Sequence, residues 1–273
     1  MYRISNEGEH FAEDITADDK NHVHFVPKHP GRTHQPKEEM VEIRLKGRDY
    51  IFTQNSIVSS VMTEPNSYLI RPSTSMFVNE NGDTWTNESL RANYESFIGA
   101  YNYVNHKQDP ELAVGFIADA CLRRIMIDQK ENVFVYYVDI LVATSKKAHP
   151  KLVQKILAKD VKYLSMGCES FISTCSACGH QAKDETEFCT HLENSKGKSF
   201  IDPRGSKRVI AEMLGTMDEG SCDFQEASFL TEVPAFGGAT VSRVLSISPE
   251  MTVRVAMPKW AYEKDAVQRF VHA

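Results

Sequence analysis

The fold of this chain is indicated most directly by residues 133–142, which read Val-Phe-Val-Tyr-Tyr-Val-Asp-Ile-Leu-Val. Nearly every side chain in this stretch is β-branched or aromatic, which is typical of a strand inside a sheet. Residues 114–122 form a second apolar run, and the polar segment 128–132 between the two runs is typical of a hairpin loop. The sequence therefore predicts a β-rich core built around this pair of strands.

Further elements are predicted on both sides of the pair. Residues 41–45 alternate apolar and charged side chains, and another strand begins at 50–52. The segment 47–49, Gly-Arg-Asp, predicts a hairpin turn between these two strands. On the C-terminal side, residues 150–157 carry apolar side chains at helical spacing, which predicts a helix with one apolar face.

Composition limits the classes of function. The chain has 273 residues, of which 41% are hydrophobic, so it is long enough for one substantial domain or two small ones. Its net charge of −6 argues against a protein that binds nucleic acid through phosphate contacts. No apolar run is long enough for a membrane span, and the first residues lack the apolar core of a secretory signal. These features predict a soluble intracellular protein.

Four segments are expected along the chain. Residues 1–40 are polar and carry five histidines without acidic or cysteine partners, which favours a poorly ordered arm over a metal-binding tract. Residues 41–95 form a β-rich segment expected to pack on the main domain, residues 96–249 form that domain, and residues 250–273 form a C-terminal tail.

A cysteine-rich stretch has metal-ligand spacing. Cys175 and Cys178 are separated by two residues and followed by a glycine, as in a zinc knuckle, and Cys189 and His191 follow. Either His191 or Cys168 completes a set of four ligands. Clustered cysteines fit a reducing compartment, so we expect a structural zinc ion (Zn²⁺) in an insertion at about 168–198, rather than unliganded thiols or a catalytic zinc.

A candidate nucleophile lies just before this stretch. Ser165 follows a short extended segment and precedes Gly167 by two residues, which suggests a serine on a tight turn. A serine needs a base and a group that orients the base. His106, in a polar loop, is the candidate base. Glu226 is a carboxylate within an otherwise apolar stretch and is the candidate third member, with Asp139 as its rival.

Three segments, taken in order across roughly residues 95 to 245, resemble the prohead (capsid maturation) serine protease family of tailed bacteriophages. The first is a histidine loop followed by a glycine-containing strand, at 105–110 and 114–116. The second is Leu-Ser-Met-Gly at 164–167. The third is a Glu-x-Ser stretch at 226–231 that runs to Pro-Ala at 234–235.

The resemblance implies an α+β fold in which helices flank a β-barrel similar to the herpesvirus assembly protease. It implies His106 as general base, Ser165 as nucleophile and Glu226 as the residue that orients the histidine. The implied substrates are phage scaffold and major capsid precursor proteins, cleaved inside the immature prohead in the host cytoplasm. Self-cleavage and self-association are also implied. Compact family members lack the cysteine-rich insertion, which we expect to be a zinc-stapled loop beside the active site.

Two other classes of function are consistent with the sequence. One is a catalytically silent structural protein of a phage particle, with the protease fold and the zinc loop as a docking surface. The other is a zinc-ribbon-like nucleic-acid module, which requires a basic face near the cysteines. The basic residues there are offset by Asp184, Glu185, Glu187 and Glu193, which favours a mixed solvated surface.

Overall fold

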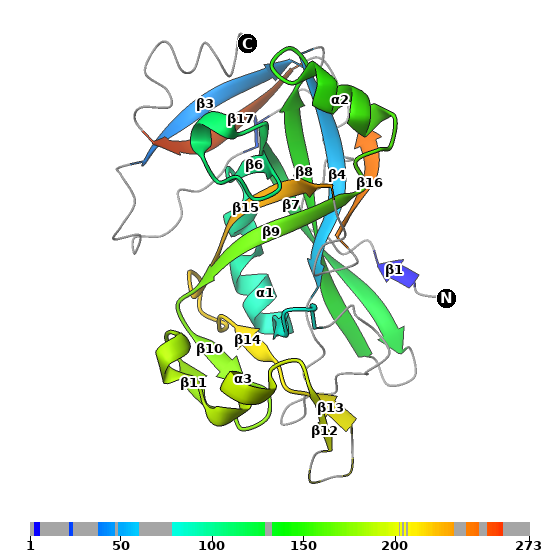
Figure 1. The fold of residues 1–273 in the computed structure, drawn as a ribbon. Helices are drawn as coiled ribbons and strands as arrows, with labels where there is room; N and C mark the ends of the chain where they lie inside the picture. The colour runs from blue at the N-terminus through cyan, green and yellow to red at the C-terminus, as the bar shows by residue number, and fades with distance from the viewer. Residues whose placement is uncertain are drawn as a thin grey trace.

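A closed β-barrel forms the centre of the molecule (Figure 1). The computed structural model describes residues 3–5, 22–23, 38–46, 49–59, 78–128, 133–201, 203, 205, 207–231, 239–245 and 250–258. The main sheet has the strand order β1-β7-β6-β15-β9-β16-β4-β8, and β7 also pairs with β8, so that seven strands close and β1 lies outside. These strands are β1 (Arg3–Ser5), β4 (Tyr50–Ser59), β6 (Tyr101–Val104), β7 (Gly115–Asp128), β8 (Val133–Ser145), β9 (Tyr163–Ser170), β15 (Cys222–Leu230) and β16 (Thr240–Leu245).

The strand pair predicted from the sequence lies in this barrel. β7 and β8 are antiparallel partners from Gly115 opposite Thr144 to Asp128 opposite Val133. Their inward-facing residues are fully buried and contribute much of the core, including Ile117, Val138, Ile140 and Val142. The nearly continuous apolar run of β8 is explained by burial on both of its faces, since every residue from Val138 to Thr144 is buried.

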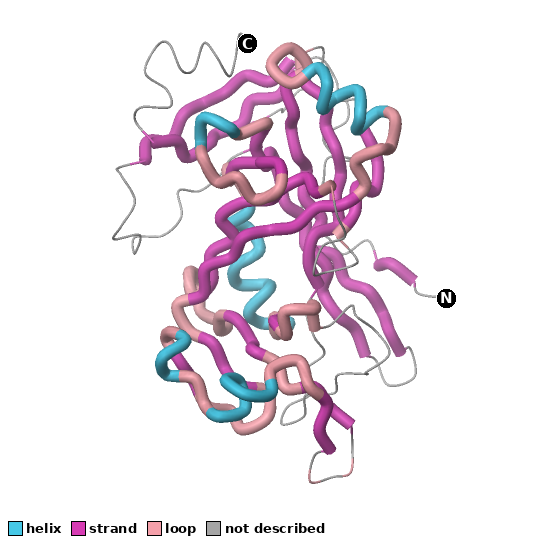
Figure 2. The backbone as a smooth tube through the Cα atoms, viewed as in Figure 1, coloured by secondary structure: helices cyan, strands magenta, loops and turns pink. Residues whose placement is uncertain are grey.

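Few helices accompany the strands in the described part of the chain, and all of these are short (Figure 2). α1 (Asn87–Asn93) begins after Thr86, whose side chain accepts a hydrogen bond from the Ser89 backbone N–H. Threonine is a common N-cap residue because its hydroxyl can accept this bond. α1 continues into the 3-10 helix η1 (Tyr94–Phe97), whose Phe97 ring stacks on Phe224 of β15 at 4.2 Å. α2 (Pro150–Leu157) forms where the helical spacing predicted it and buries Val153 and Ile156.

The two strands that were expected to form a hairpin through residues 47–49 have other partners among the described residues. β3 (Glu38–Lys46) pairs with β17 (Glu250–Pro258), which also pairs with β2 (His22–Val23). β4, by contrast, pairs with β8 and β16 inside the barrel. The alternation of apolar and polar residues along a strand indicates which face is buried, but it does not identify the partner strand. The prediction that these two consecutive strands pair with each other was therefore wrong.

Two expected boundaries also differ from the structure. β4 is a strand of the barrel, so Tyr50–Ser59 belongs to the main domain and not to a segment packed on it. The expected tail begins with strand β17, which is fully paired with β3. Most of the polar arm, and the chain after Pro258, lie outside the described residues. Within the described part of the chain, no helix has the length and apolar character needed to cross a bilayer.

A small cysteine-containing module is inserted between β9 and β15 and lies at one end of the molecule (Figure 1). Its sheet has the order β11-β10-β14-β5, so that one strand, β5, comes from the chain between barrel strands β4 and β6. The other elements are short. The module comprises β5 (Asp83–Thr84), β10 (Ser173–Cys175), β11 (Gln181–Ala182), η3 (Glu185–Glu187), α3 (Thr190–Ser195), β12 (Ser199–Ile201), β13 (Lys207–Val209) and β14 (Glu212–Leu214).

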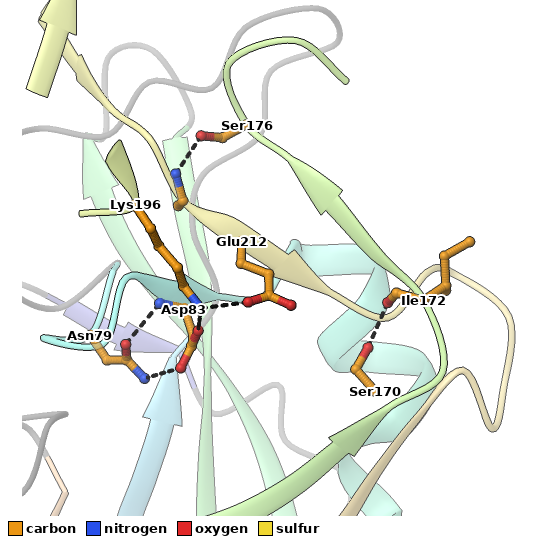
Figure 3. A network of polar contacts seen from close by, with 8 residues as sticks. Asn79, Asp83, Ser170, Ile172, Ser176, Lys196 and Glu212 are labelled. Carbon is orange, nitrogen blue, oxygen red and sulfur yellow. Dashed lines mark hydrogen bonds and ion pairs between the residues drawn. The ribbon is translucent and has the colours of Figure 1, made fainter. Parts of the chain in front are cut away.

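A lysine that follows α3 forms ion pairs with strands β5 and β14 of the module (Figure 3). The Lys196 ammonium, just after α3, lies 2.6 Å from Asp83 Oδ1 and also contacts the Glu212 carboxylate. Asn79 donates to the second oxygen of Asp83 at 3.3 Å. Because these carboxylates are largely shielded from water, they need the cation between them.

Replacing Lys196 with methionine is expected to destabilise the protein by about 2 kcal/mol, because two shielded carboxylates lose their shared cation. Lys198→Met is the matched control, since the exposed Lys198 ammonium contacts only the Asn194 carbonyl oxygen among the described residues. The midpoint of chemical denaturation measures the difference. Equal losses in the two variants would contradict a role for the Lys196 ion pairs.

Candidate active site and metal centre

A buried carboxylate and a histidine form the centre of the candidate active site. Glu226 lies on β15 with only 1% of its surface exposed. Its Oε1 atom is 2.6 Å from Nδ1 of His106, and its Oε2 atom accepts a hydrogen bond from the Ser228 hydroxyl, also at 2.6 Å. The fully buried Ser228 thus satisfies the side of the carboxylate that the histidine does not reach.

The loop that carries His106 is held in an unusual backbone conformation. Asn105 and His106 both have positive φ angles, of 52° and 54°. Such angles are uncommon for residues other than glycine and persist where surrounding contacts fix them. Here the His106 backbone N–H donates to the Ser228 hydroxyl at 3.2 Å, and the Asn105 side chain accepts from the Thr231 N–H at 3.1 Å. The histidine is therefore fixed against β15 through backbone as well as side-chain contacts.

The electrostatic effect of this pairing is to favour the protonated imidazole. The hydrogen bond to Glu226 raises the pKa of His106 above its usual value, which outweighs the lowering caused by partial burial, and the negative charge of Glu226 acts in the same direction. With Nδ1 bonded to the carboxylate, a neutral ring carries its proton on Nδ1 and presents Nε2 as an acceptor. This tautomer is the one that a general base requires.

Ser165 lies on the same face of the sheet as the histidine–glutamate pair. It is directly opposite Ser228 in the antiparallel pairing of β9 with β15, and Gly167 is opposite Glu226. Because side chains two residues apart point to the same side of a strand, Ser165, Gly167, Glu226 and Ser228 share one face. Leu164 points the other way and is fully buried in the barrel core.

The expectation of a tight turn at Ser165 is wrong, because the residue lies within strand β9. The glycine two residues later suggested a turn, but the structure gives it a different role. Ser165 is partly exposed, and among the described residues its hydroxyl makes no hydrogen bond with His106.

Gly167 provides space for the carboxylate. A Cβ atom at this position would lie 3.0 Å from Glu226 Cγ, Glu226 Oε1 and Gln108 Nε2. Nine in ten of the contacts that Cβ atoms make in proteins are longer than this, so the Glu226 side chain would have to shift by a few tenths of an ångström. Any larger residue at 167 would therefore disturb the hydrogen bond between Glu226 and His106.

A Gly167→Ala variant is expected to stay folded but to lower the pKa of His106 toward its ordinary value, because the displaced carboxylate no longer stabilises the imidazolium. Histidine titration by NMR measures this shift. Ala182→Gly in the module, which changes a methyl group far from His106 along the chain, is the control for a general effect on the fold. An unchanged His106 titration in Gly167→Ala would contradict the steric argument.

Asp139, the rival third member, belongs to a different cluster. Its carboxylate lies 2.8 Å from Nε of Arg123 and accepts hydrogen bonds from Ser56 and Gln54. These partners come from β4 and β7 and satisfy a carboxylate that is 5% exposed. Asp139 is thus part of an ion pair within the barrel wall, and the structure does not bring it to His106.

The cysteine-rich module brings four potential metal ligands together. The ligand atoms of Cys175, Cys178, Cys189 and His191 all lie within 4.8 Å of one another. The Cys178 and Cys189 sulfur atoms are 3.6 Å apart, and Nδ1 of His191 is 3.9 Å from the Cys189 sulfur. A tetrahedral site with metal–sulfur bonds of about 2.3 Å separates its sulfur atoms by about 3.8 Å. The group could therefore hold a metal ion.

Local backbone structure explains how these ligands converge. Gly179, with a φ angle of 73°, closes a tight turn in which its N–H donates to the Cys175 carbonyl oxygen. Cys189 is the N-cap of α3, and His191 lies in the first turn of that helix. The two residues therefore do not have to share a helix face. Cys168 lies outside this cluster, and His191 is its fourth member.

The environment of Cys189 favours the thiolate, which is the form that binds metals. Burial raises the pKa of the Cys189 thiol, but hydrogen bonds from the Leu192 backbone N–H and from the Cys178, Cys175 and His191 side chains outweigh it. Together they lower the pKa to about 6.

Ser228 and Gln108 lie in the candidate site but were not predicted from the sequence to belong to it. Ser228 bridges the Glu226 carboxylate and the His106 backbone, and Gln108 donates a long hydrogen bond of 3.4 Å to Glu226 Oε1. Ser228 could have been predicted from the sequence. Glu226 and Ser228 are polar residues two positions apart in an apolar strand, so their side chains point to the same face.

Neither a family model, nor a curated protein, nor a solved structure matches this chain with a significant score. The structure defines a class of protein: a seven-stranded β-barrel that has a histidine paired with a buried glutamate on one face and a separate Cys₃His cluster in an inserted module.

Proposed function

We propose that the protein is a serine endopeptidase in which Ser165 is the nucleophile, His106 the general base and Glu226 the residue that orients the histidine. The observation that carries this proposal is the hydrogen-bonded chain from Ser228 through Glu226 to His106, on the face of the sheet that Ser165 also occupies. A buried, fully hydrogen-bonded carboxylate on Nδ1 of a partly exposed histidine is what general-base catalysis needs.

The proposed reaction proceeds through an acyl-enzyme. Ser165 Oγ attacks the carbonyl carbon of the scissile peptide bond, while Nε2 of His106 takes the hydroxyl proton. The Glu226 carboxylate stabilises the imidazolium that forms. His106 then gives the proton to the leaving amine, and a water molecule, activated by the same nitrogen, releases the acyl group from Ser165. Ser228 is a positioning residue for this reaction, because its hydroxyl bonds both to the Glu226 carboxylate and to the His106 backbone N–H.

The substrate class is proposed from the three motifs of the sequence that resemble the phage prohead proteases. On this basis the substrates are phage scaffold and major capsid precursor proteins, and cleavage takes place inside the immature prohead in the host cytoplasm. Self-processing and self-association belong to the same proposal.

For the metal cluster we propose a structural Zn²⁺ ion held by Cys175, Cys178, Cys189 and His191. Three thiolates and one imidazole suit zinc, and a site with four protein ligands leaves no open position for catalysis. When bound, the ion would supply a cross-link that holds the module's short elements together. Within the module, Cys175, Leu192 and Ile210 form only a small hydrophobic cluster, which explains why a further constraint is needed.

One observation favours a second candidate function. Ser165 and His106 form no hydrogen bond in the described part of the structure, which is consistent with a catalytically silent structural protein of a phage particle that uses the module for docking. Catalytic hydrogen bonds are, however, often long before substrate binds, so this geometry is also that of a resting protease.

The pH dependence of cleavage tests the assigned roles. Because the base must be neutral, kcat/KM for a capsid precursor should fall as pH drops through the pKa of His106, which Glu226 raises above its usual value. In Glu226→Gln the acid limb should move to lower pH, since the neutral amide no longer favours imidazolium, and the plateau should fall by at least about 100-fold.

Glu169→Gln is the matched control, because Glu169 is an exposed carboxylate on β9 that bonds to Gln225. This variant should keep the wild-type acid limb and rate. An acid limb that stays in place in Glu226→Gln would contradict the proposed partnership of Glu226 and His106.

A further inference from the structure

The strands that carry Ser165 and Glu226 are also joined by two cysteines outside the metal cluster. Cys168 on β9 and Cys222 on β15 have their sulfur atoms 2.8 Å apart. Cys168 lies opposite Phe224 and Cys222 lies opposite Ser170, so the two cysteines are diagonal neighbours across the antiparallel pair. Both point to the barrel core, away from the face that holds Glu226.

We propose that Cys168 and Cys222 form a reversible disulfide bond that links β9 to β15 directly beneath the candidate active site. A disulfide has a sulfur–sulfur distance of about 2.05 Å, so closing the present gap requires a movement of less than about 1 Å. Both cysteines are free thiols in this structure.

Exposure of the two thiols defines the order of the reaction. Although its thiol faces the core, Cys168 is a partly exposed residue, whereas Cys222 is fully buried. A small-molecule disulfide therefore reaches Cys168 first. The Cys168 thiolate attacks one sulfur of that reagent, forms a mixed disulfide and releases one thiolate. The Cys222 sulfur then attacks the Cys168 sulfur and displaces the second thiolate, and the two cysteine protons pass to the two released thiolates.

The rate of this oxidation is expected to be slow. Burial raises the pKa of Cys168 well above its ordinary value, with the contact to Cys222 acting in the same direction. Because only the thiolate attacks, the reaction with a small disulfide should take hours and not seconds. The other cysteines do not compete for this bond: Cys175, Cys178 and Cys189 form the metal cluster, and Cys121 is buried on β7.

The expected consequence is a more stable pairing of β9 with β15. A cross-link between residues 54 apart in sequence removes freedom from the unfolded chain, although a zinc ion in the module already closes part of that loop. We therefore expect Tm to rise by at least about 5 °C on oxidation and to return on reduction. Neither the bond nor its effect on Tm depends on whether the protein is a protease.

The test uses the full-length chain loaded with zinc, reduced and then incubated with oxidised glutathione. The remaining thiols are alkylated under native and then denaturing conditions, and peptides are mapped by mass spectrometry. The expected product has lost two hydrogens and contains a peptide in which Cys168 is linked to Cys222. Cys121→Ser should give the same product, while Cys222→Ala should stop at a single glutathione on Cys168.

Three results would overturn the proposal. The first is alkylation of both Cys168 and Cys222 after prolonged oxidation. The second is a disulfide from either residue to a cysteine of the metal cluster. The third is a Tm that falls when the Cys168–Cys222 bond forms, because a bond that strains the strand pair is not one that the native pairing accommodates.

Discussion

Replacing Ser165 with alanine is expected to abolish self-processing and the cleavage of capsid precursors, with a loss in rate of at least about 1,000-fold. The physical reason is that Ser165 and Ser228 are the serines that the described strands β9 and β15 place on this face, and Ser228 is not open to a substrate. Ser228 is fully buried and already donates to Glu226, so it cannot reach a substrate. Intact mass spectrometry of the wild-type and variant chains, incubated alone and with precursor proteins, measures the fragments.

Ser199→Ala is the matched control, since Ser199 is an exposed serine in β12 of the module. It should give the wild-type fragments. Ser228→Ala should retain cleavage at a reduced rate, because it removes a hydrogen bond to Glu226 and leaves the nucleophile in place. Fragments that persist in Ser165→Ala would show that Ser165 is not the nucleophile. Intact chains and precursors with every variant, wild type included, would favour the silent structural protein.

Loss of the metal ion is expected to unfold the inserted module. Structural zinc binding contributes about 10–16 kcal/mol in small zinc domains, which is far more than the few buried apolar side chains of this module supply. Cys175→Ser removes a fully buried ligand and should lower bound zinc from one equivalent to none. Metal content by elemental analysis and hydrogen exchange of residues 173–214 measure the two effects.

Cys121→Ser controls for the replacement of a buried cysteine, because Cys121 lies in the barrel wall and outside the cluster. It should keep one zinc ion and a protected module. The barrel should stay protected in Cys175→Ser, since its core is formed by residues of β7, β8 and β15. Full protection of residues 173–214 in the metal-free protein would contradict the structural role proposed for the ion.

The parts of the fold that could be predicted are those encoded by local patterns. The apolar runs at 114–122 and 133–142 and the helical spacing at 150–157 each determine an element through its own residues, and these elements are present. The pairing of β3 with β17 could not be predicted, because it joins segments about 200 residues apart and no local pattern identifies the partner of a strand.

The candidate site also has parts that could be predicted from the sequence and parts that could not. His106 and Glu226 were singled out by residue type and order, and the structure places their side chains in contact; their roles in catalysis stay a prediction. Ser165 was expected on a turn because a glycine follows it, whereas the glycine provides room for Glu226 from the neighbouring strand. That steric requirement arises between strands, so the sequence around Ser165 alone does not contain it. The contact of Cys168 with Cys222 arises between the same two strands.

The most direct measurement is the reaction of the full-length protein with a fluorophosphonate, which labels a serine only when a neighbouring base activates it. The account predicts a single adduct on Ser165, found by peptide mass mapping, and its loss in His106→Ala and Glu226→Gln. An unlabelled Ser165 in the folded, zinc-loaded protein, or labelling that is unchanged in both variants, would contradict the central claim that Ser165, His106 and Glu226 act together.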